Sequence, residues 1–516
     1  MTRTQYLGFI GLLIISFTAY MDYIIANVAL PYIQATFSIP VVSLMWVSTL
    51  YYLPNAALMI SMGKLGDLFG HKKLLFIGVI CFALSSALCG FANNTTVLFI
   101  GRFLLGASAA ILFPVSVSTL SLYAGNQHRS KALSILSLCN GLGIAIGPLL
   151  GGFLISYLNW RSVFLINIPM VCIGLYFLLR YVNFTQPLQA VKIDYLGMLL
   201  LFLTVAALTM AVTQSAQYGW LAHASILYYI VTLTSLILLI RVERKAEEPL
   251  LTFEFFKHPL FSLAFLFCAA VGAGISSLLF FMPLYLNDMK SYSADLSAWV
   301  LFAIPVMTLI LPPFFPALLK RYKISSVIMM GSVALLISTI SLSFFNVNTA
   351  LTVIVIALML AGFSWAVSMT MVNLSVQQAL AEKFHGVGTG MAYAVYNVVS
   401  SVLLAIVVSI YHVIENRKST ALLNHINLQL SPTQTHAITT LLSDPSQMQT
   451  ILQNTTPSLR QAVLSIFQQS FFAGMQSVMW IVSAVVLASI ALSIVLLKKS
   501  KPKPIEITSD HFKQSL

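Results

Sequence analysis

Long apolar runs alternate with short polar segments along almost the whole chain. Each run is about 20 residues long, the length that a helix needs to cross the hydrocarbon core of a bilayer. The strands of a membrane barrel need only about 9–11 residues and alternate in polarity, a pattern that these runs lack. The runs predict fourteen spanning helices, at residues 5–29, 42–62, 74–92, 96–122, 130–157, 162–182, 194–215, 223–241, 259–286, 294–319, 325–345, 350–378, 386–413 and 471–497.

Composition restricts the fold class to an integral membrane protein. Of the 516 residues, 59% are hydrophobic and only 8% are charged, whereas soluble domains carry about 25% charged residues. The mean hydropathy of +0.92 agrees. Because lipid offers the backbone no hydrogen-bond partners, only helices and closed barrels can span it. The sequence therefore predicts an all-α membrane protein.

The basic residues predict which side each connection faces. A net charge of +13 would point to nucleic acid in a soluble protein, but here the charges lie in short loops. Of the 27 Lys and Arg residues, 21 fall at the termini and in connections on one side of the predicted helices. Basic loops stay on the cytoplasmic side. We therefore expect both termini in the cytoplasm and no nucleic-acid partner.

Two charged residues stand well inside predicted spans, Asp22 in the first and Arg102 in the fourth. A charge at the centre of a bilayer costs about 2.5–3.5 kcal/mol on insertion scales, so such residues are functional candidates. Two interpretations are open. The residues form a structural ion pair, or Asp22 is a protonatable carboxylate that faces a central cavity and exchanges a proton as its surroundings change.

Several stretches of the first half carry a resemblance to one family. Residues 21–31 read MDYIIANVALP, 63–73 read GKLGDLFGHKK, 102–110 read RFLLGASAA, 143–152 read GIAIGPLLGG and 159–169 read NWRSVFLINIP. Together they resemble the signatures of fourteen-span drug:proton antiporters of the EmrB/QacA type, a subgroup of the major facilitator superfamily. Leu68 and His71 stand where that family has Arg, and Leu105 stands where Gln is usual.

The resemblance implies roles for individual residues. It implies proton coupling by Asp22 and Arg102. It implies a conformational latch formed by Gly63, Asp67, Gly70 and Lys72. It also implies an antiporter motif, found in exporters of the superfamily and absent from its importers, at Gly143, Gly147, Pro148, Gly151 and Gly152. Glycines four residues apart share one helix face and let two helices approach closely, while proline kinks a helix.

The family also implies an architecture of two six-helix bundles with two helices inserted between them. The expected parts are an N-terminal bundle at 1–182, the inserted helices and a cytoplasmic linker at 183–258, a C-terminal bundle at 259–497 with an external loop at 414–470, and a tail at 498–516. The substrate cavity would lie between the bundles. Its candidate lining residues, each of which is otherwise explained by helix packing, are Asn27, Tyr51, Trp365, Asn373, Gln377 and Asn397.

The sequence thus predicts a secondary transporter of the bacterial inner membrane that exports lipophilic drugs or toxic small molecules in exchange for protons. A dedicated proton-coupled exporter of one metabolite, such as a siderophore, is the alternative. No nucleotide-binding G-x-x-x-x-G-K-[ST] and no H-E-x-x-H motif is present, so we expect no enzyme, catalytic residue, cofactor or metal. Expected partners are the small-molecule substrate, protons and the lipid bilayer. Loop 414–470 either docks a periplasmic adaptor or forms a passive lid.

Overall fold

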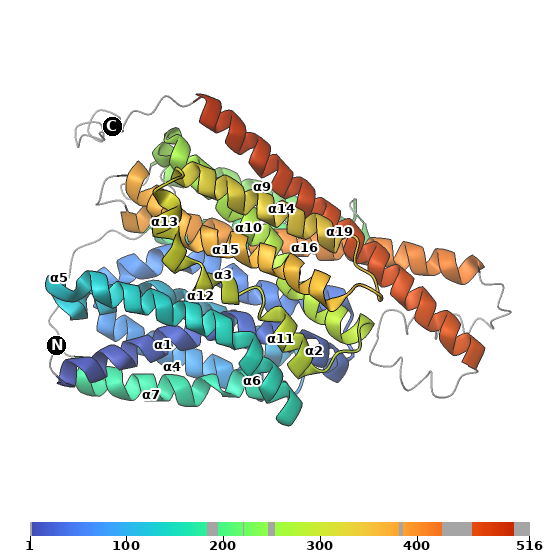
Figure 1. Cartoon of the computed structure of the whole chain (residues 1–516), viewed down its shortest axis with the longest axis horizontal. Coiled ribbons are helices and arrows are strands. Elements are labelled where there is room, and N and C mark those ends of the chain that lie inside the picture. The colour runs from blue at the N-terminus through green and yellow to red at the C-terminus, as the bar shows by residue number, and fades with distance from the viewer. Residues whose placement is uncertain are drawn as a thin grey trace.

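The computed structural model describes residues 3–182, 194–219, 221–245, 253–380, 385–425 and 457–499. These residues form helices and no strand, as predicted, and the long helices run roughly along one axis of the molecule (Figure 1). The N-terminal half consists of α1 (Arg3–Val28), α2 (Leu30–Phe37), α3 (Val41–Phe69), α4 (His71–Gly90), α5 (Thr95–Tyr157), α6 (Ser162–Leu165) and α7 (Asn167–Tyr181).

The remaining helices comprise a pair, which the sequence analysis expects to be inserted between the bundles, and a set that we call the C-terminal half. The pair is α8 (Tyr195–Tyr218) and α9 (His223–Glu243). The C-terminal half consists of η1 (Phe253–Lys257), α10 (Pro259–Leu284), η2 (Tyr285–Met289), α11 (Ala294–Leu301), α12 (Val306–Ile310), η3 (Pro312–Phe314), α13 (Phe315–Leu319), α14 (Ile324–Leu342), α15 (Leu351–Ala379), α16 (His385–His425) and α19 (Pro457–Lys499). Helix α8 packs on α9, and it also contacts α3 of the first half and α16 of the second.

The described residues contain thirteen helices that are long and apolar enough to span a membrane, or fourteen if one bent pair is a single span. That pair is Ala294–Leu301 with Val306–Leu319, bent by 41°, and it occupies the predicted tenth span. Prolines 305, 312, 313 and 316 explain the break, because each removes a backbone donor and clashes with the preceding turn. Thirteen of the predicted spans are therefore matched by continuous helices, and the bent pair provides the fourteenth if it is counted as one span.

Two connections are shorter than predicted. Helix α3 continues to Phe69 and α4 begins at His71, so Gly70, with φ +90°, is the only residue between them. A left-handed backbone is costly for residues other than glycine, which explains why the turn falls there. The predicted spans 96–122 and 130–157 join into α5, broken at Gly125 with φ +66°.

The predicted external loop 414–470 is helical at both of its ends. Helix α16 extends to His425 and α19 begins at Pro457, and the two pack against each other. Residues 458–469 therefore lead helically into the last span, and Val463, Ile466 and Phe467 are buried there. Residues 426–456 and the tail from 500 onward lie outside the described residues.

The two halves meet along their helices and at one end of the molecule. Helix α3 packs on α16, and α5 packs on α11 and α12. One end of the bundle contains α2, α6 and the start of α5. We call it the external end, because the positions of the basic residues predict that it lies outside the cell. Within each half, α1 packs on α5 and α7, while α10 packs on α15, α16 and α19.

Candidate functional site

Asp22 and Arg102 lie side by side inside the N-terminal half. Asp22 on α1 is 0% exposed and Arg102 on α5 is 2% exposed. The Arg102 Nη1 atom lies 4.0 Å from Asp22 Oδ2, beyond the roughly 2.7–2.9 Å of a direct charge-assisted hydrogen bond. Neither atom has a hydrogen-bond partner among the described residues. The two charges therefore attract each other through a low-dielectric interior, while both facing atoms keep unused hydrogen-bonding capacity.

The Arg102 guanidinium is held by α3 and α6. Its Nε donates to the Val47 carbonyl oxygen at 2.7 Å. Its central carbon lies 4.4 Å from the centroid of the Tyr51 ring and 5.8 Å from that of the Phe164 ring. A cation over an aromatic face gains about 0.5–2 kcal/mol. Tyr51, a predicted cavity residue, is thus a direct neighbour of the buried cation.

Asn167 completes this site, although the sequence analysis assigns it no role. Its Nδ2 donates to Asp22 Oδ1 at 2.6 Å and to Ser86 Oγ at 2.9 Å. Asn167 is 0% exposed and is the first residue of α7, just after the break that separates α6 from α7. It belongs to the stretch 159–169 that carries part of the family resemblance. The resemblance of that stretch was the only signal in the sequence, and it did not show that Asn167 lies next to Asp22.

The Asp22 site lies toward the external end of the bundle. Val47, Ser86, Arg102 and Asn167 each stand within about 10 Å, or two helical turns, of the end of their helix on that side. Asp22 does not line the central cavity in this conformation. Asp22 is instead connected to the cavity through aromatic rings. Tyr23 lines the cavity, and the centroid of its ring lies 5.8 Å from that of the Tyr51 ring, which lies beside Arg102.

A small aromatic cavity lies between the two halves. Helices α1, α3 and α5 contribute five of its lining residues, and α15 and α16 contribute the other five. They are Tyr20, Tyr23, Met59, Phe113, Ile144, Trp365, Met369, Tyr393, Tyr396 and Asn397. The cavity has a volume of about 50 Å³, far below the roughly 300–1,000 Å³ of sites for drug-sized ligands. The cavity is therefore closed down in this conformation.

Of the six predicted cavity residues, the structure brings two to the cavity. Trp365 and Asn397 line it, and their Nε1 and Oδ1 atoms are buried without a hydrogen-bond partner among the described residues. Asn373 supports the lining from behind, since its Nδ2 donates to the Tyr393 hydroxyl at 3.1 Å.

The other three predicted residues lie elsewhere. Asn27 accepts a hydrogen bond from Ser48 at 3.3 Å, Tyr51 stacks on Arg102, and Gln377 is exposed. The sequence analysis also missed aromatic residues that line the cavity. Helical spacing offered a signal for these, because Tyr20 and Tyr23 on α1 are three residues apart and share one face.

Comparison with known proteins decides the family. The family model described as "Major Facilitator Superfamily" matches residues 12–404. The chain belongs to this superfamily. It is therefore a membrane transporter and not an enzyme.

Named relatives and solved structures agree with this assignment. The transporter is 28% identical to "Multidrug resistance protein Stp" of Mycobacterium tuberculosis over 414 residues, 80% of this chain and 76% of that protein. It is 24% identical to "Riboflavin transporter RibZ" of Clostridioides difficile over 385 residues, 74% of this chain and 82% of that protein. A bacterial homologue of the human lysosomal transporter Spinster, inward-facing and unoccupied, has a TM-score of 0.65 at 14% identity, covering 98% of this chain and 100% of that chain. This last likeness shows the fold alone.

The glycines of the predicted antiporter motif pack the transporter's α5 against α1 beside Asp22. A Cβ atom at Gly143 would lie 2.6 Å from the Phe17 carbonyl oxygen, and one at Gly147 would lie 3.2 Å from the Met21 carbonyl oxygen. At Gly151 it would lie 2.9 Å from an Ile25 side-chain atom. The three glycines therefore share one face, as their spacing predicts.

The last motif residues act on the other side of α5. Pro148 is buried inside α5. A Cβ atom at Gly152 would lie 2.3 Å from the Ala298 Cβ of α11 and 2.8 Å from the Ala294 carbonyl oxygen. Only glycine permits this approach, so Gly152 brings the two halves of the transporter into contact at the external end.

A second contact closes the external end. The Tyr32 hydroxyl of α2 donates to Asn287 Oδ1 of η2 at 2.9 Å. Burial, together with the acidic Asp288 and Asp295 nearby, raises the pKa of the Tyr32 hydroxyl, so this group stays protonated and remains a donor. Asn287 lies in a π-helical segment, a geometry that occurs frequently at functional sites. We call the two contacts, Tyr32–Asn287 and Gly152–Ala298, the external seal.

The predicted latch residues lie at the opposite end, around the α3–α4 turn. Gly63 and Asp67 belong to α3, Gly70 forms the turn and Lys72 lies in the first turn of α4. The side chain of Asp67 lies outside the described residues. His71, which stands where the family has Arg, is 3% exposed.

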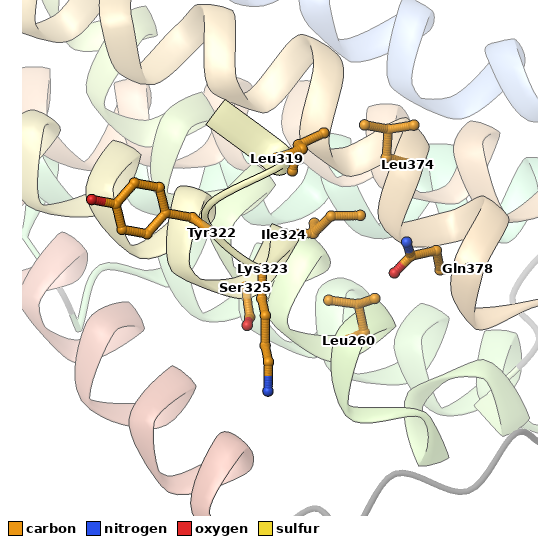
Figure 2. A pocket seen from close by; sticks show the side chains of 8 residues that line it. All are labelled: Leu260, Leu319, Tyr322, Lys323, Ile324, Ser325, Leu374 and Gln378. Carbon is orange, nitrogen blue, oxygen red and sulfur yellow. The ribbon is translucent and has the colours of Figure 1, made fainter. Parts of the chain in front are cut away.

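A larger pocket lies within the C-terminal half near that same end (Figure 2). It is lined by Leu260, Leu319, Tyr322, Lys323, Ile324, Ser325, Leu374 and Gln378. All of these residues come from one half, so a rocking motion of one half against the other would not expose the pocket alternately to the two sides. The cavity between the halves is therefore the better candidate for a substrate site.

Proposed function

We propose that this transporter exports lipophilic small molecules in exchange for protons by alternating access, in the bacterial inner membrane with both termini in the cytoplasm. The observation that carries the proposal is the buried Asp22–Arg102 pair, which is linked by ring contacts to the aromatic cavity between the halves. The relative named as a multidrug resistance protein supports it. The orientation rests on the position of 21 of the 27 basic residues.

The mechanism couples the charge of Asp22 to the cavity. When Asp22 is ionised it neutralises Arg102, and when it is protonated Arg102 loses that partner. Arg102 is stacked on Tyr51, whose ring lies 5.8 Å from that of Tyr23 in the cavity wall. A change of charge at Asp22 therefore reaches the substrate site through rings in contact, and a substrate that displaces Tyr23 acts on Arg102 in return.

The cavity favours lipophilic substrates. Its lining contains no charged side chain, so a strongly charged molecule would lose its hydration without gaining an ion pair. Tyrosine and tryptophan rings attract a single delocalised positive charge. The unpartnered Trp365 Nε1 and Asn397 Oδ1 offer one donor and one acceptor, which would orient the substrate.

Efflux of a fluorescent lipophilic cation from cells that lack their own exporters tests this proposal. We expect the wild type to export the dye only with a proton gradient, and Asp22→Asn to lose gradient-dependent efflux at equal expression. Glu254→Gln is the matched control, because Glu254 is an exposed acid paired with Lys257, and it should export normally. Equal efflux by Asp22→Asn and wild type would remove Asp22 from the mechanism.

A dedicated exporter of one metabolite is the second candidate. The relative named as a riboflavin transporter favours it, because flat aromatic molecules also stack on tyrosine and tryptophan rings. A panel of cationic dyes, neutral drugs, flavins and siderophores separates the two. Export of one compound alone would support the second candidate, and export of several unrelated compounds the first.

Helices α16 and α19 project past the predicted spans at the external end. A periplasmic adaptor would dock on this projecting pair. Helix α19 packs on α16, and both helices continue beyond the predicted spans at this end. A pull-down of the membrane-embedded transporter with candidate adaptors, compared with a chain lacking 426–456, would test this partner.

A further inference from the structure

Asp22 receives its direct hydrogen bond from a neutral amide rather than from Arg102. Asn167 Nδ2 lies 2.6 Å from Asp22 Oδ1, whereas Arg102 Nη1 lies 4.0 Å from the other carboxylate oxygen. An ionised carboxylate only accepts hydrogen bonds, so the amide nitrogen is the end of Asn167 that must face it. The amide oxygen, Asn167 Oδ1, is buried and has no hydrogen-bond partner among the described residues. Half of this amide is therefore unused while Asp22 is ionised.

Ser86 could also partner the other amide orientation, by donating its proton to Asn167 Oδ1 in place of the Phe164 carbonyl oxygen. The Ser86 hydroxyl accepts from Asn167 Nδ2 at 2.9 Å and donates to the Phe164 carbonyl oxygen at 2.8 Å. A hydroxyl both donates and accepts. If the amide turned over, Asn167 Oδ1 would accept the proton of a neutral Asp22, and the Ser86 hydroxyl would remain within reach of the amide.

Phe164 connects the turning of the Asn167 amide to Arg102 and to the break between α6 and α7. Its ring lies 5.8 Å from the Arg102 guanidinium carbon, and its carbonyl oxygen is the acceptor of Ser86. Phe164 belongs to α6, which ends at Leu165, and Asn167 starts α7. A change in the Ser86 hydrogen bond therefore acts on the joint between α6 and α7.

We propose that Asn167 is a positioning residue that sets the pH at which Asp22 exchanges its proton. It holds the ionised carboxylate through Nδ2 and turns to hold the neutral acid through Oδ1. The proton comes from water on one side of the membrane, forms an O–H bond on Asp22, and returns to water on the other side, while Asn167 gains and loses none. This inference rests on the proposed proton coupling at Asp22.

Other groups also face Asp22 and remain in place in the test. Arg102 on α5 is its cationic neighbour. Among the described residues, Tyr51 on α3 and Cys89 on α4 are also titratable groups near enough to interact with its charge. From α7 the facing group is the neutral Asn167. A substitution of Asn167 therefore changes the hydrogen bonding of Asp22 without changing any neighbouring charge.

The pH dependence of dye transport by purified protein in liposomes tests the proposal. In Asn167→Leu the ionised Asp22 loses its direct donor. Hydrogen bonds to charged groups are about twice as strong as neutral ones, so the ionised form loses more than the acid. We expect the pH of half-maximal transport to rise by about one unit. Substrate-triggered proton release from the detergent-solubilised protein should show the same rise.

Two further variants make the result specific. Ser86→Ala should shift the midpoint in the same direction by less, because Asn167 stays but loses its anchor. Asn140→Leu is the matched control: Asn140 accepts from Ser16 at 2.7 Å, another bond between α5 and α1, and its removal should leave the midpoint in place. If Asn167→Leu does not fold, as judged by gel filtration and dye binding, the Ser86→Ala shift carries the test.

The outcomes separate this inference from the proposed function. If Asp22→Asn abolishes coupling and the Asn167→Leu midpoint equals that of wild type, Asn167 is only a packing residue and the inference is overturned alone. If Asp22→Asn keeps gradient-dependent transport, the proposed function fails and the inference fails with it. An upward shift in Asn167→Leu that is absent in Asn140→Leu supports both.

Discussion

The two halves of this transporter bury their polar groups differently. The N-terminal half places an acid, a base and an amide together in its interior, namely Asp22, Arg102 and Asn167. The described residues of the C-terminal half contain no buried acid–base pair. Its buried acid among the described residues is Glu415, 9% exposed and hydrogen-bonded to the Tyr411 hydroxyl. Glu415 lies toward the external end of the candidate span Gly388–Leu423 and has no buried base beside it among the described residues.

This difference indicates a division of labour between halves of related design. A buried carboxylate can take up and release a proton, so the N-terminal half would carry the coupling ion. The C-terminal half contributes Trp365 and Asn397 to the cavity, and their Nε1 and Oδ1 atoms have no hydrogen-bond partner among the described residues. These groups suit substrate recognition. Three substitutions, one in each half and one where they meet, can break or sharpen this comparison.

The largest effect is expected from Arg102→Leu in the N-terminal half. Removing one partner of a buried ion pair leaves the other charge uncompensated, which costs about 3–5 kcal/mol. We expect the free energy of unfolding to fall by about this amount at pH 8. A high pH disfavours protonation of Asp22, which would otherwise remove its uncompensated charge. Denaturant or thermal unfolding of the purified transporter measures this fall.

The double variant Arg102→Leu with Asp22→Asn provides the control for that loss. It removes both charges, so most of the lost stability should return. If Arg102→Leu alone is as stable as wild type at pH 8, the 4.0 Å pair contributes nothing, and the N-terminal half would not differ from the C-terminal half in the way described.

An intermediate effect is expected from Trp365→Ala in the C-terminal half. Loss of a cation–π contact of about 0.5–2 kcal/mol corresponds to roughly a tenfold loss of affinity for a cationic dye, while the pH midpoint of transport should stay unchanged. Dye binding by fluorescence measures the first and liposome transport the second. Trp299→Ala is the control, because Trp299 is 63% exposed and lies outside the cavity. A shifted midpoint in Trp365→Ala would contradict the division of labour.

Several features of the fold and site were predictable because they depend on composition and helical period. Apolar runs set by membrane thickness identified the spans. A charge inside a span is costly, and this marked Asp22 and Arg102. The four-residue spacing of Gly143, Gly147 and Gly151 placed them on one face, and all three contact α1.

Other features depend on contacts that no local pattern encodes. Asn167 lies 145 residues from Asp22 in the sequence, and a single buried amide carries no periodic signal. Gln377 and Trp365 lie on the same helix, yet one is exposed and the other 1% exposed, because rotation about the helix axis is fixed by tertiary packing. The broken tenth span was foreseeable from its four prolines, but its bend of 41° was not.

The smallest effect is expected from Tyr32→Phe, where the halves meet. The Tyr32–Asn287 hydrogen bond is worth about 0.5–1.5 kcal/mol, and it exists only while the external seal is closed. Its loss should favour the externally open state by about twofold to twelvefold. Spin labels on the exposed Asn93 and Asn348, in a background without native cysteines, would report this as a larger population of long distances.

Tyr285→Phe separates the seal from a general loosening of the external end. The Tyr285 hydroxyl also donates one hydrogen bond near this end, to the Asn346 carbonyl oxygen at 2.9 Å, but both residues belong to the C-terminal half. Its loss should lower stability slightly without changing the distance between the halves. If both variants lengthen that distance equally, the Tyr32 bond is not a gate. If only Tyr32→Phe does so, the contact between the halves, rather than the interior of either one, controls opening.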